Sequence, residues 1–357
     1  MHGGRIYEYA ERMGVAPNDI LDFSANINPL GPPDSVMAAI HDALHGVVHY
    51  PDSRHQTLKQ VLAASFGIEN PHAIFVGNGA SEVIDLTIRA VSPNRVFVFE
   101  PAFSEYHAAA HRAGAQLIQL SLSEEIGDTV RTATPRPTLN DMVIINNPHN
   151  PTGMSWGKSE LMDVIAYLCS IGVLVMVDES FMDFRWDHHQ LSVIENVMQW
   201  PTLVVIRSAT KMYSIPGLRF GSGIAHPDLV RRIEQHRDKW SVNHLAQAAA
   251  IAAYQGHEFV RRTWDWLQVE QEYICGTWGN APWVRLYPPS VNYFLVQLDD
   301  RLNPDDIRIR LENEGIFVRW CAQFENLTPH HMRIAIKLRP ENERLWEAFH
   351  RIVASLM

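Results

Sequence analysis

The sequence is poor in cysteine and has no excess of positive charge. Its three cysteines, Cys169, Cys275 and Cys321, are far apart and form no C-x-x-C pair. This spacing argues against a disulfide framework or a zinc knuckle and suits a reducing cytoplasm. The formal net charge is −10 in a chain of 357 residues, so we expect neither nucleic acid nor an anionic membrane as a partner.

The sequence also lacks a long apolar run. The longest runs, such as residues 171–177, are too short to cross a bilayer. The first residues, MHGGRIYEYAERMG, carry charges where a signal peptide needs an apolar stretch, and we therefore expect a cytoplasmic location. Hydrophobic residues make up 46% of the chain, which at this length predicts one large or two medium domains with an ample core.

Short apolar stretches alternate with helical patterns from about residue 55 onward. The expected strands are residues 73–76, 95–99, 142–145, 173–177, 203–206 and 221–225. Helical patterns lie between them, for instance at residues 81–91, 105–113 and 158–170. Buried β-branched strands that alternate with helices predict an α/β fold with a mostly parallel sheet covered on both sides.

The pattern changes after residue 288 and indicates a smaller α+β domain. Its expected order is strand, helix, strand, strand and helix, at residues 293–297, 305–314, 316–319, 331–336 and 341–355. We expect a large domain over residues 47–255, with residues 1–46 and 256–357 forming an N-terminal arm and the small domain. In such a fold the default ligand site lies at the carboxyl ends of the parallel strands.

A glycine-rich loop, GNGASE at residues 77–82, follows one expected strand and opens a helix. Small residues there let backbone N–H groups approach an anion at the helix N-terminus. The competing interpretation is the dinucleotide fingerprint of a nicotinamide dehydrogenase, with Glu100 in the place of the ribose-binding acid. Glu82 occupies the position of the third glycine of that motif, which argues against it.

Three further loops lie at the ends of expected strands. The segment NNPHNPTG follows residue 145, and Asp178 and Glu179 follow residue 177. Taken alone, these segments fit an ordinary turn and a solvated carboxylate. The third loop carries RSATK at residues 207–211 and is followed by GLRFG at residues 217–221. A partly buried lysine beside cationic neighbours is a usable nucleophile and base, although this segment alone also fits a surface turn.

Together the loops supply what pyridoxal 5′-phosphate (PLP) requires. They offer an anion cradle, a lysine, a carboxylate for a ring nitrogen and an asparagine for a phenolic oxygen. PLP accepts electrons only while its pyridine nitrogen stays protonated, which a carboxylate such as Asp178 enforces. We therefore expect PLP as the cofactor and a small amino acid as the substrate.

The motifs NPHNPTG, DES-F, S-A-TK and GLRFG, in this order, resemble the fold-type I aminotransferase family of class I/II. The resemblance covers essentially the whole chain and implies a mostly parallel seven-stranded sheet in a large domain, plus a smaller α+β domain. It implies that Lys211 holds PLP as a Schiff base, that Asp178 pairs with the ring nitrogen and that Asn150 bonds the phenolic oxygen.

The same resemblance implies contacts at the rest of the site. Tyr106 would stack on the cofactor ring, and Arg333 would bind the substrate carboxylate. Tyr50 would reach the cofactor phosphate of a neighbouring subunit, which implies a homodimer. The residues expected at the subunit's own cofactor phosphate are Gly79, Ala80, Ser208 and Arg219.

Within the family the sequence is similar to two branches, the histidinol-phosphate aminotransferases and the threonine-phosphate decarboxylases of cobalamin biosynthesis. HGG at residues 2–4, LDFSANINPLG at residues 21–31 and WSVN at residues 240–243 resemble the decarboxylases. Phe181 also resembles them, since many aminotransferases have a tyrosine there that bonds the phenolic oxygen, and phenylalanine cannot make that bond. Lys337 departs from the pattern, because a second arginine is expected at this position.

The decarboxylase resemblance implies that L-threonine O-3-phosphate is converted to (R)-1-aminopropan-2-yl phosphate. The expected substrate-binding residues are Arg333, Asn28, His2, Ser24, Arg319 and Lys337. An aminotransferase acting on histidinol phosphate is the first alternative, and a PLP-fold regulator without turnover is the second. We expect no metal site, because the helical pair His41 and His45 lacks both the glutamate and the third ligand of a zinc motif.

Overall fold

The computed structural model describes residues 3–357 and divides them into two compact units. The larger unit contains residues 30–150 and 154–262. The smaller unit contains the chain up to residue 29, residues 151–153 and residues 263–357. The expected boundary at residue 46 therefore differs from the observed one. Residues 30–46 belong to the larger unit, where helix α2 (Asp34–Ala43) packs against α11 (His244–Gln255).

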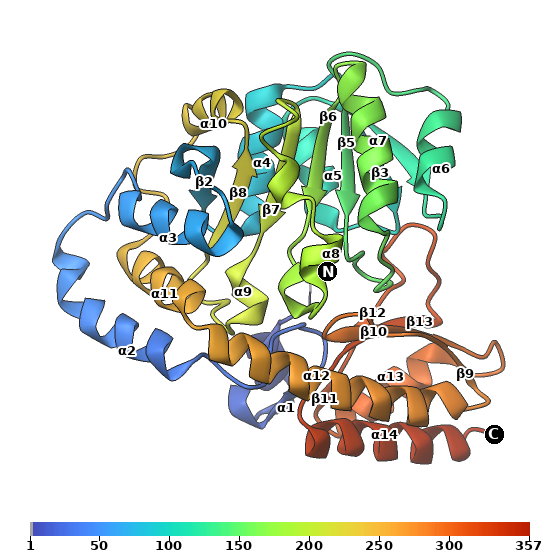
Figure 1. Ribbon diagram of the computed structural model, residues 1–357. Coiled ribbons are helices and arrows are strands. Elements are labelled where there is room, and N and C mark those ends of the chain that lie inside the picture. Colours follow the sequence, from blue (N-terminus) through green and yellow to red (C-terminus); the bar gives the residue numbers. More distant parts are fainter. Residues whose placement is uncertain (1–2) are drawn as a thin grey trace. The chain divides into compact units, whose positions relative to one another are not determined.

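The larger unit is built on a seven-stranded sheet with the strand order β2-β8-β7-β6-β5-β3-β4 (Figure 1). Strands β3 to β7 run parallel, while β8 is antiparallel to both of its neighbours. The bounds are β2 (Ile74–Gly77), β3 (Arg95–Glu100), β4 (Gln116–Ser121), β5 (Met142–Asn146), β6 (Leu174–Asp178), β7 (Leu203–Arg207) and β8 (Gly221–Ala225). The predicted mostly parallel sheet is therefore confirmed, and β4 is an edge strand that the sequence pattern did not reveal.

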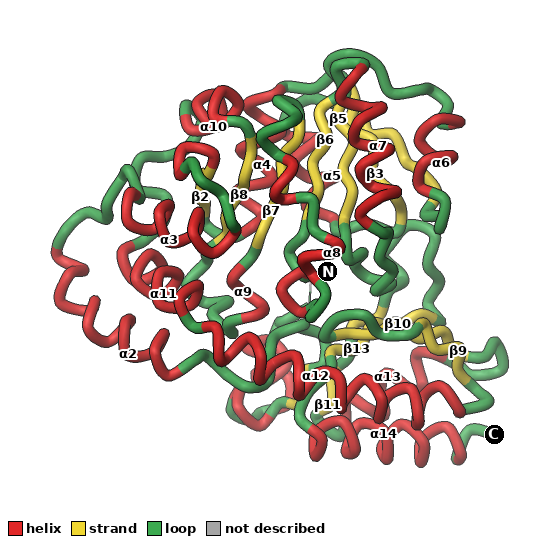
Figure 2. The backbone as a smooth tube through the Cα atoms, viewed as in Figure 1, coloured by secondary structure: helices red, strands yellow, loops and turns green. Residues whose placement is uncertain are grey.

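Helices connect these strands and cover the sheet (Figure 2). Those of the larger unit include α3 (Gln56–Phe66), α4 (Ala80–Val91), α5 (Ser104–Arg112), α6 (Ile126–Thr132), α7 (Lys158–Ser170), α8 (His188–Leu191), α9 (Ala209–Met212) and α10 (Pro227–Glu234). One core cluster joins alternate strand residues such as Val98 and Ile144 to Val83 of α4 and Ile233 of α10. The intervening strand residues are buried as well, so both faces of the sheet are covered.

The smaller unit contains a four-stranded antiparallel sheet in the order β12-β13-β10-β9. Its strands are β9 (Val284–Tyr287), β10 (Tyr293–Leu298), β12 (Arg319–Trp320) and β13 (His331–Ala335), with helices α13 (Pro304–Asn313) and α14 (Arg339–Ala354). A separate parallel pair joins β1 (Leu21–Asp22) to β11 (Ile316–Phe317). The expected single strand over residues 316–319 is therefore wrong, because its two halves pair with different partners.

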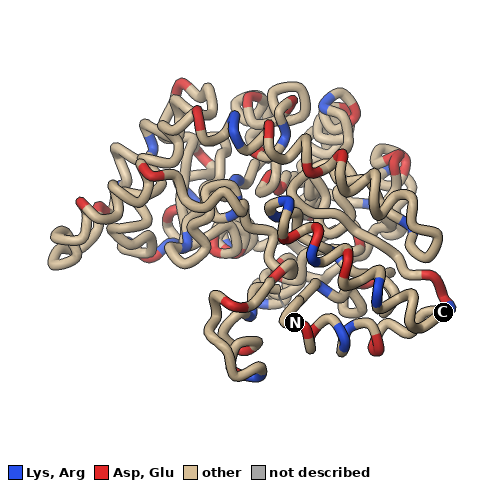
Figure 3. The backbone as a smooth tube through the Cα atoms, turned by 90° about the horizontal axis from the view of Figure 1, so that it is seen from below, with Lys and Arg blue, Asp and Glu red and all other residues tan. Residues whose placement is uncertain are grey.

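The N-terminal helix α1 (Ile6–Met13) packs within the smaller unit. The ring of Tyr9 stacks on that of Phe317 at 3.9 Å, and Ala10, Ile20 and Phe317 form a small buried cluster. A long helix, α12 (His257–Thr277), begins in residues of the larger unit and ends in residues of the smaller one. No helix among residues 3–357 is long and apolar enough to span a membrane. Basic and acidic residues are interspersed along the backbone (Figure 3).

Candidate active site

The carboxyl ends of three parallel strands bring the predicted loops together. Asn146 at the end of β5 is in register with Asp178 at the end of β6, and Asp178 is in register with Ile206 of β7. Strand β7 leads through Ser208 into the short helix α9, which carries Lys211. The parallel register thus gathers the asparagine loop, the carboxylate and the lysine segment at one edge of the sheet.

Asp178 is a buried carboxylate whose two oxygens both accept hydrogen bonds. The Tyr106 hydroxyl donates to its Oδ2 at 2.5 Å, and the backbone N–H of Ser180 donates to its Oδ1 at 2.9 Å. Tyr106 itself is buried on α5. The structure therefore joins the residue expected to stack on the cofactor ring to the carboxylate expected at the ring nitrogen.

The asparagine loop is fixed by its own side chains. Asn146 accepts a hydrogen bond from the backbone N–H of Asn150 at 2.8 Å and donates to the Asp178 carbonyl at 2.9 Å. Asn147 makes two bonds with the backbone of Trp156, accepting at 2.9 Å and donating at 3.2 Å. These two asparagines were not assigned a role from the sequence. They hold the segment that presents Asn150.

The residues of the predicted anion cradle meet where β2 and β8 pair, because Gly77 and Gly221 are in register. Gly79 has a φ of +82°, and a Cβ atom built there would lie 2.4 Å from the Arg219 guanidinium. A Cβ atom on Gly221 would lie 2.4 Å from the backbone nitrogen of Ala80. Glycine is required at both positions, since only its missing side chain lets the guanidinium and the backbone amides approach so closely.

Ser208 directly follows β7, whose last residue, Arg207, is in register with Ser222 of β8, and Ser208 is buried. Its hydroxyl has no hydrogen-bond partner among the described residues. A buried hydroxyl without a partner costs free energy, which a bound acceptor group removes. A phosphate monoester supplies such acceptors and is the group that Arg219 and backbone N–H donors bind well. The donor set of this unit therefore fits the phosphate of PLP.

Lys211 and Phe181 face each other. The Lys211 ammonium lies 5.0 Å from the centroid of the Phe181 ring, which is buried and brings no hydroxyl to this place. The Thr210 hydroxyl donates to the Phe220 carbonyl at 3.2 Å. This bond joins the segment that carries Lys211 to the GLRFG loop that carries Arg219.

A buried ion pair links the ends of β6 and β7. Arg207 lies 3.0 Å from Glu179 and also contacts Asp183, and Ser192 donates to Glu179 at 2.7 Å. The sequence analysis assigned Arg207 and Glu179 no role. Their position was a usable signal, because Glu179 directly follows Asp178 and Arg207 directly precedes Ser208. The pair therefore ties together the backbone on either side of the site.

His149, within the NPHNPTG motif, is also buried. Burial lowers its pKa to about 4, while hydrogen bonds with the backbone of Phe99 and Pro101 act in the opposite direction. The imidazole is therefore neutral at pH 7. Its own backbone N–H donates to the Met154 carbonyl at 2.8 Å, which closes the turn.

The smaller unit gathers most of the residues predicted to bind substrate. Arg333 donates to the Ser24 carbonyl at 2.9 Å, and Arg319 lies directly opposite Arg333 in the β12–β13 pairing. Burial lowers the pKa of both guanidinium groups. The Ser24 hydroxyl donates to Asp22 at 2.5 Å, and Asn28 donates to the Thr263 hydroxyl at 2.8 Å.

Three predicted residues remain, namely Lys337, His2 and Tyr50. Lys337 lies two residues beyond β13, which ends at Ala335. Its ammonium is 3.8 Å from the Glu341 carboxylate and 5.8 Å from the centroid of the Phe23 ring. His2 lies outside the described residues. Tyr50, predicted to serve a neighbouring subunit, is 80% exposed on the larger unit.

Comparisons with known proteins agree with this geometry. Residues 18–351 match the family model described as Aminotransferase class I and II. The chain is 33% identical to threonine-phosphate decarboxylase of Salmonella typhimurium, over 99% of this chain and 97% of that one. It is 32% identical to histidinol-phosphate aminotransferase 2 of Ralstonia nicotianae, over 95% and 90%. The histidinol-phosphate aminotransferase structure from Clostridium acetobutylicum matches with a TM-score of 0.86 at 26% identity, over 93% and 99%.

The fold and the strand-end loops are those of a PLP-dependent enzyme. The chain belongs to the aminotransferase class I and II family, and its cofactor is PLP. The predictions of the family, the fold class and the cofactor are confirmed. The roles of individual residues stay predictions, although the structure brings those of the larger unit, apart from Tyr50, together at one sheet edge.

Proposed function

We propose that this enzyme is a carboxy-lyase that converts L-threonine O-3-phosphate to (R)-1-aminopropan-2-yl phosphate in cobalamin biosynthesis. The observation that carries the proposal is the 2.9 Å hydrogen bond from Arg333 to the Ser24 carbonyl. Residues 21–31 are the segment most specific to the decarboxylase resemblance. This bond joins them directly to the arginine expected at the substrate carboxylate.

Further bonds tie the same segment to the sheet that carries Arg333. The backbone N–H of Ala335 donates to the Phe23 carbonyl at 2.9 Å, and the Asn292 side chain donates to the Asn26 carbonyl at 3.0 Å. Asn292 directly precedes β10. The segment is thus part of the wall around Arg333, which supports a role in substrate selection.

The charges of this wall suit a substrate with two anionic groups. Arg319 and Arg333 are cross-strand neighbours, and burial lowers the pKa of both. Two partly desolvated cations side by side cost free energy, which an anionic ligand offsets. Threonine O-phosphate carries a carboxylate and a phosphate, and arginine binds either group through its planar fork.

PLP, when bound, draws the electrons of a broken bond at the substrate Cα into its ring. Asp178 would hold the proton on the ring nitrogen, and Asn150 would donate to the phenolic oxygen. The phosphate would be bound by Gly79, Ala80, Ser208 and Arg219. Lys211 would hold the cofactor and, once the carboxylate has left as CO₂, return one proton to Cα.

Phe181 favours this reaction over transamination. Many aminotransferases of the family place a tyrosine hydroxyl at the phenolic oxygen, and the buried Phe181 ring beside Lys211 offers none. An aminotransferase for histidinol phosphate is the second candidate, favoured by the 32% identity to the Ralstonia nicotianae enzyme. Its substrate has a phosphate but no carboxylate, so the two reactions are distinguished by CO₂ release.

We further propose that the enzyme is a cytoplasmic homodimer. Large apolar side chains are exposed on one stretch of the larger unit, namely Leu44 (46%), Val47 (57%), Val48 (77%) and Tyr50 (80%). A run of exposed apolar residues in a soluble protein marks an interaction surface. A second copy of the chain would cover it and receive Tyr50 at its cofactor phosphate.

The test compares two substrates with one preparation of PLP-loaded enzyme. Threonine O-phosphate is supplied with a labelled carboxyl carbon and CO₂ is counted, while histidinol phosphate is supplied with 2-oxoglutarate and glutamate is counted. The proposal expects CO₂ at a rate abolished by Lys211→Ala and little glutamate. Rapid glutamate formation without CO₂ would replace it by the aminotransferase candidate.

A further inference from the structure

The segment that carries Tyr50 is held by the linker between α10 and α11. Tyr50 lies between the short helix η2 (Leu44–Val48) and α3, and its ring stacks on that of Trp240. The ring centroids are 4.7 Å apart and the planes differ by 30°. Both rings are on the surface, since Tyr50 is 80% and Trp240 47% exposed. The stack therefore adds little to the core, yet it fixes the direction of an exposed side chain.

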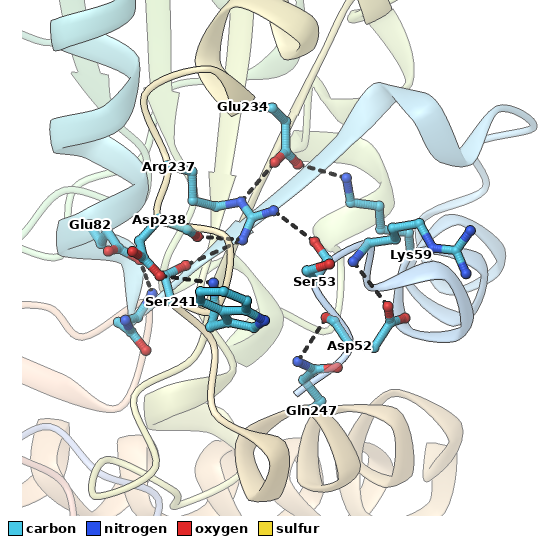
Figure 4. Close-up of polar contacts among 12 residues, drawn as sticks. Asp52, Ser53, Lys59, Glu82, Glu234, Arg237, Asp238, Ser241 and Gln247 are labelled. Atoms are coloured by element: carbon cyan, nitrogen blue, oxygen red, sulfur yellow. Dashed lines mark hydrogen bonds and ion pairs between the residues drawn. The ribbon is translucent and has the colours of Figure 1, made fainter. Parts of the chain in front are cut away.

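Two side chains hold the backbone that follows Tyr50 (Figure 4). Arg237 donates to the Ser53 carbonyl at 3.1 Å, and Gln247 donates to the Asp52 carbonyl at 3.2 Å. Gln247 also donates to the Val242 carbonyl at 2.9 Å. Arg237 of the linker and Gln247 of α11 thus bind Asp52 and Ser53 through backbone carbonyls, whatever side chains those two residues carry.

Arg237 is itself fixed by acidic and backbone partners. It donates to Glu234 at 2.7 Å and to the Asp238 carbonyl at 2.9 Å, and Lys59 reaches the same Glu234 at 2.7 Å (Figure 4). Burial acts to raise the pKa of Glu234, but Lys59 and Arg237 outweigh it and the pKa is lowered. Glu234 stays ionised at neutral pH and holds both cations in place.

The same linker contacts the loop that carries Arg219 of the predicted anion cradle in its own subunit. Asn243 donates from its side chain to the Leu218 carbonyl at 3.0 Å, and Leu218 directly precedes Arg219. Residues 237–247 therefore contact both the loop that presents Arg219 and the segment that presents Tyr50. Of the WSVN segment, Trp240 makes the ring contact and Asn243 the loop contact.

We infer that Trp240, with Arg237 and Gln247, is a positioning residue for Tyr50 and thereby sets the affinity of the neighbouring subunit for the phosphate of its cofactor. The inference rests on the proposed homodimer and on the proposed role of Tyr50. An exposed tyrosine on a surface segment loses rotational freedom when it binds a ligand, which weakens binding. A ring that is already stacked has lost that freedom beforehand.

The first experiment measures binding of PLP and of pyridoxal, which lacks the phosphate, to the apoenzyme. Trp240→Ala should raise the Kd of PLP about tenfold and leave that of pyridoxal unchanged, since only the phosphate contact is weakened. Trp240→Phe should restore PLP affinity, because a ring remains to stack. Trp186→Ala, at a tryptophan that is 69% exposed, is the matched control and should change neither value.

Gln247→Leu provides a second variant in which the Trp240 ring is retained. It should also weaken PLP more than pyridoxal. An equal loss for the two ligands in both variants, or no loss in either, would overturn the inference. Thermal unfolding of each apoenzyme verifies that the variants are folded before binding is measured.

The second experiment decides in which subunit Trp240 acts. Trp240→Ala chains are co-expressed with Lys211→Ala chains under different tags, and the mixed dimers are purified through both. In a mixed dimer the only lysine for PLP lies on the Trp240→Ala chain, whose cofactor receives Tyr50 from a chain with an intact Trp240. Borohydride trapping of PLP on Lys211 should therefore regain wild-type affinity.

Trapping that stays as weak as in the Trp240→Ala homodimer would show that Trp240 acts within its own subunit, and the inference would fail. The readout does not depend on turnover, so an absence of CO₂ from threonine O-phosphate would reject the proposed reaction alone. Monomers in light scattering of the wild-type holoenzyme would instead reject the homodimer, and the inference with it.

Discussion

The Tyr106 hydroxyl donates a hydrogen bond of 2.5 Å to Oδ2 of Asp178. The bond joins the two side chains that are expected to contact the cofactor ring. Both groups are buried, on α5 and at the end of β6. A hydrogen bond to a buried carboxylate contributes on the order of 1.5–3 kcal/mol. This hydrogen bond therefore fixes the positions of both side chains before the cofactor binds.

Tyr106→Phe should destabilise the apoenzyme more than the holoenzyme. Without PLP the substitution removes a donor from a buried carboxylate, and the free energy of unfolding should fall by about 1.5–3 kcal/mol. With PLP bound, a donor on the cofactor ring would take the place of the lost hydroxyl at Asp178 and compensate part of the loss. Urea unfolding of both forms measures the difference, and Tyr7→Phe, at a residue 77% exposed, is the control. Equal losses in the two forms would contradict the expectation.

Asp178→Asn should leave PLP bound but slow turnover by about 10²–10³-fold, a loss of the size seen when a key electrostatic donor is removed from an active site. The neutral amide keeps the shape of the side chain but cannot keep a proton on the ring nitrogen. Steady-state kcat measures the loss, with Asp163→Asn on the exposed side of α7 as the control. A variant that retained most of its kcat would exclude the assigned role.

Arg333→Lys should raise the KM for threonine O-phosphate by roughly tenfold or more while PLP affinity stays the same, because lysine keeps the charge but loses the two-pronged contact. The bond to the Ser24 carbonyl is also weakened. Arg285→Lys, at an exposed position on β9, serves as the control in the same unit. If KM did not change, the substrate anion would have to bind elsewhere.

Lys337→Arg tests the one departure from the expected pattern. The lysine lies near Glu341 in the first turn of α14, beyond the strand that carries Arg333. Because it is already engaged by a carboxylate, we expect less than a threefold change in KM, the size of a partly exposed ion-pair effect. A marked fall in KM would instead show that the arginine fork is a substrate contact that this chain lacks.

Stability should fall between neutral and acid pH partly through His55. This residue is buried, both ring nitrogens lack partners among the described residues, and burial lowers its pKa to about 4. The folded state therefore stays neutral where the unfolded state takes up a proton, near its ordinary pKa of 6.5. Stability contributed by the neutral ring is complete above pH 6.5 and falls as the pH drops toward 4.

His55→Asn should remove that dependence. The φ of His55 is +53°, a conformation that asparagine tolerates better than most residues. Between pH 7 and pH 5 the wild type should lose about 1–2 kcal/mol more than the variant. Urea unfolding at the two pH values gives the comparison. An identical pH dependence would show that another group is responsible.

Much of this site could be predicted because its residues stand at strand ends, which apolar runs reveal. The strand order was enough to place Asp178 and the Asn150 segment at one sheet edge, where the parallel register brings them together, while their roles at the cofactor were implied by the family resemblance. The edge strand β4 was missed because its residues are mostly exposed or half-buried and show no continuous apolar run. The boundary near residue 46 was missed because only packing of α2 against α11 decides it.

The support of the site was harder to infer. The Arg207–Glu179 ion pair links positions nearly thirty residues apart, and nothing in a single sequence indicates which charges a fold will bury together. The stack of Tyr50 on Trp240 joins still more distant segments. In both cases the residue type was visible, while the partner depended on the strand order and the course of the linker.

The measurement that tests the central claim most directly follows CO₂, aminopropanol phosphate, inorganic phosphate and the form of the cofactor in one reaction with threonine O-phosphate. The account predicts steady CO₂ and aminopropanol phosphate in equal amounts, with the cofactor remaining PLP and little inorganic phosphate released. A burst of inorganic phosphate would show elimination at Cβ. Conversion of the cofactor to its amine form without CO₂ would contradict the account and establish an aminotransferase.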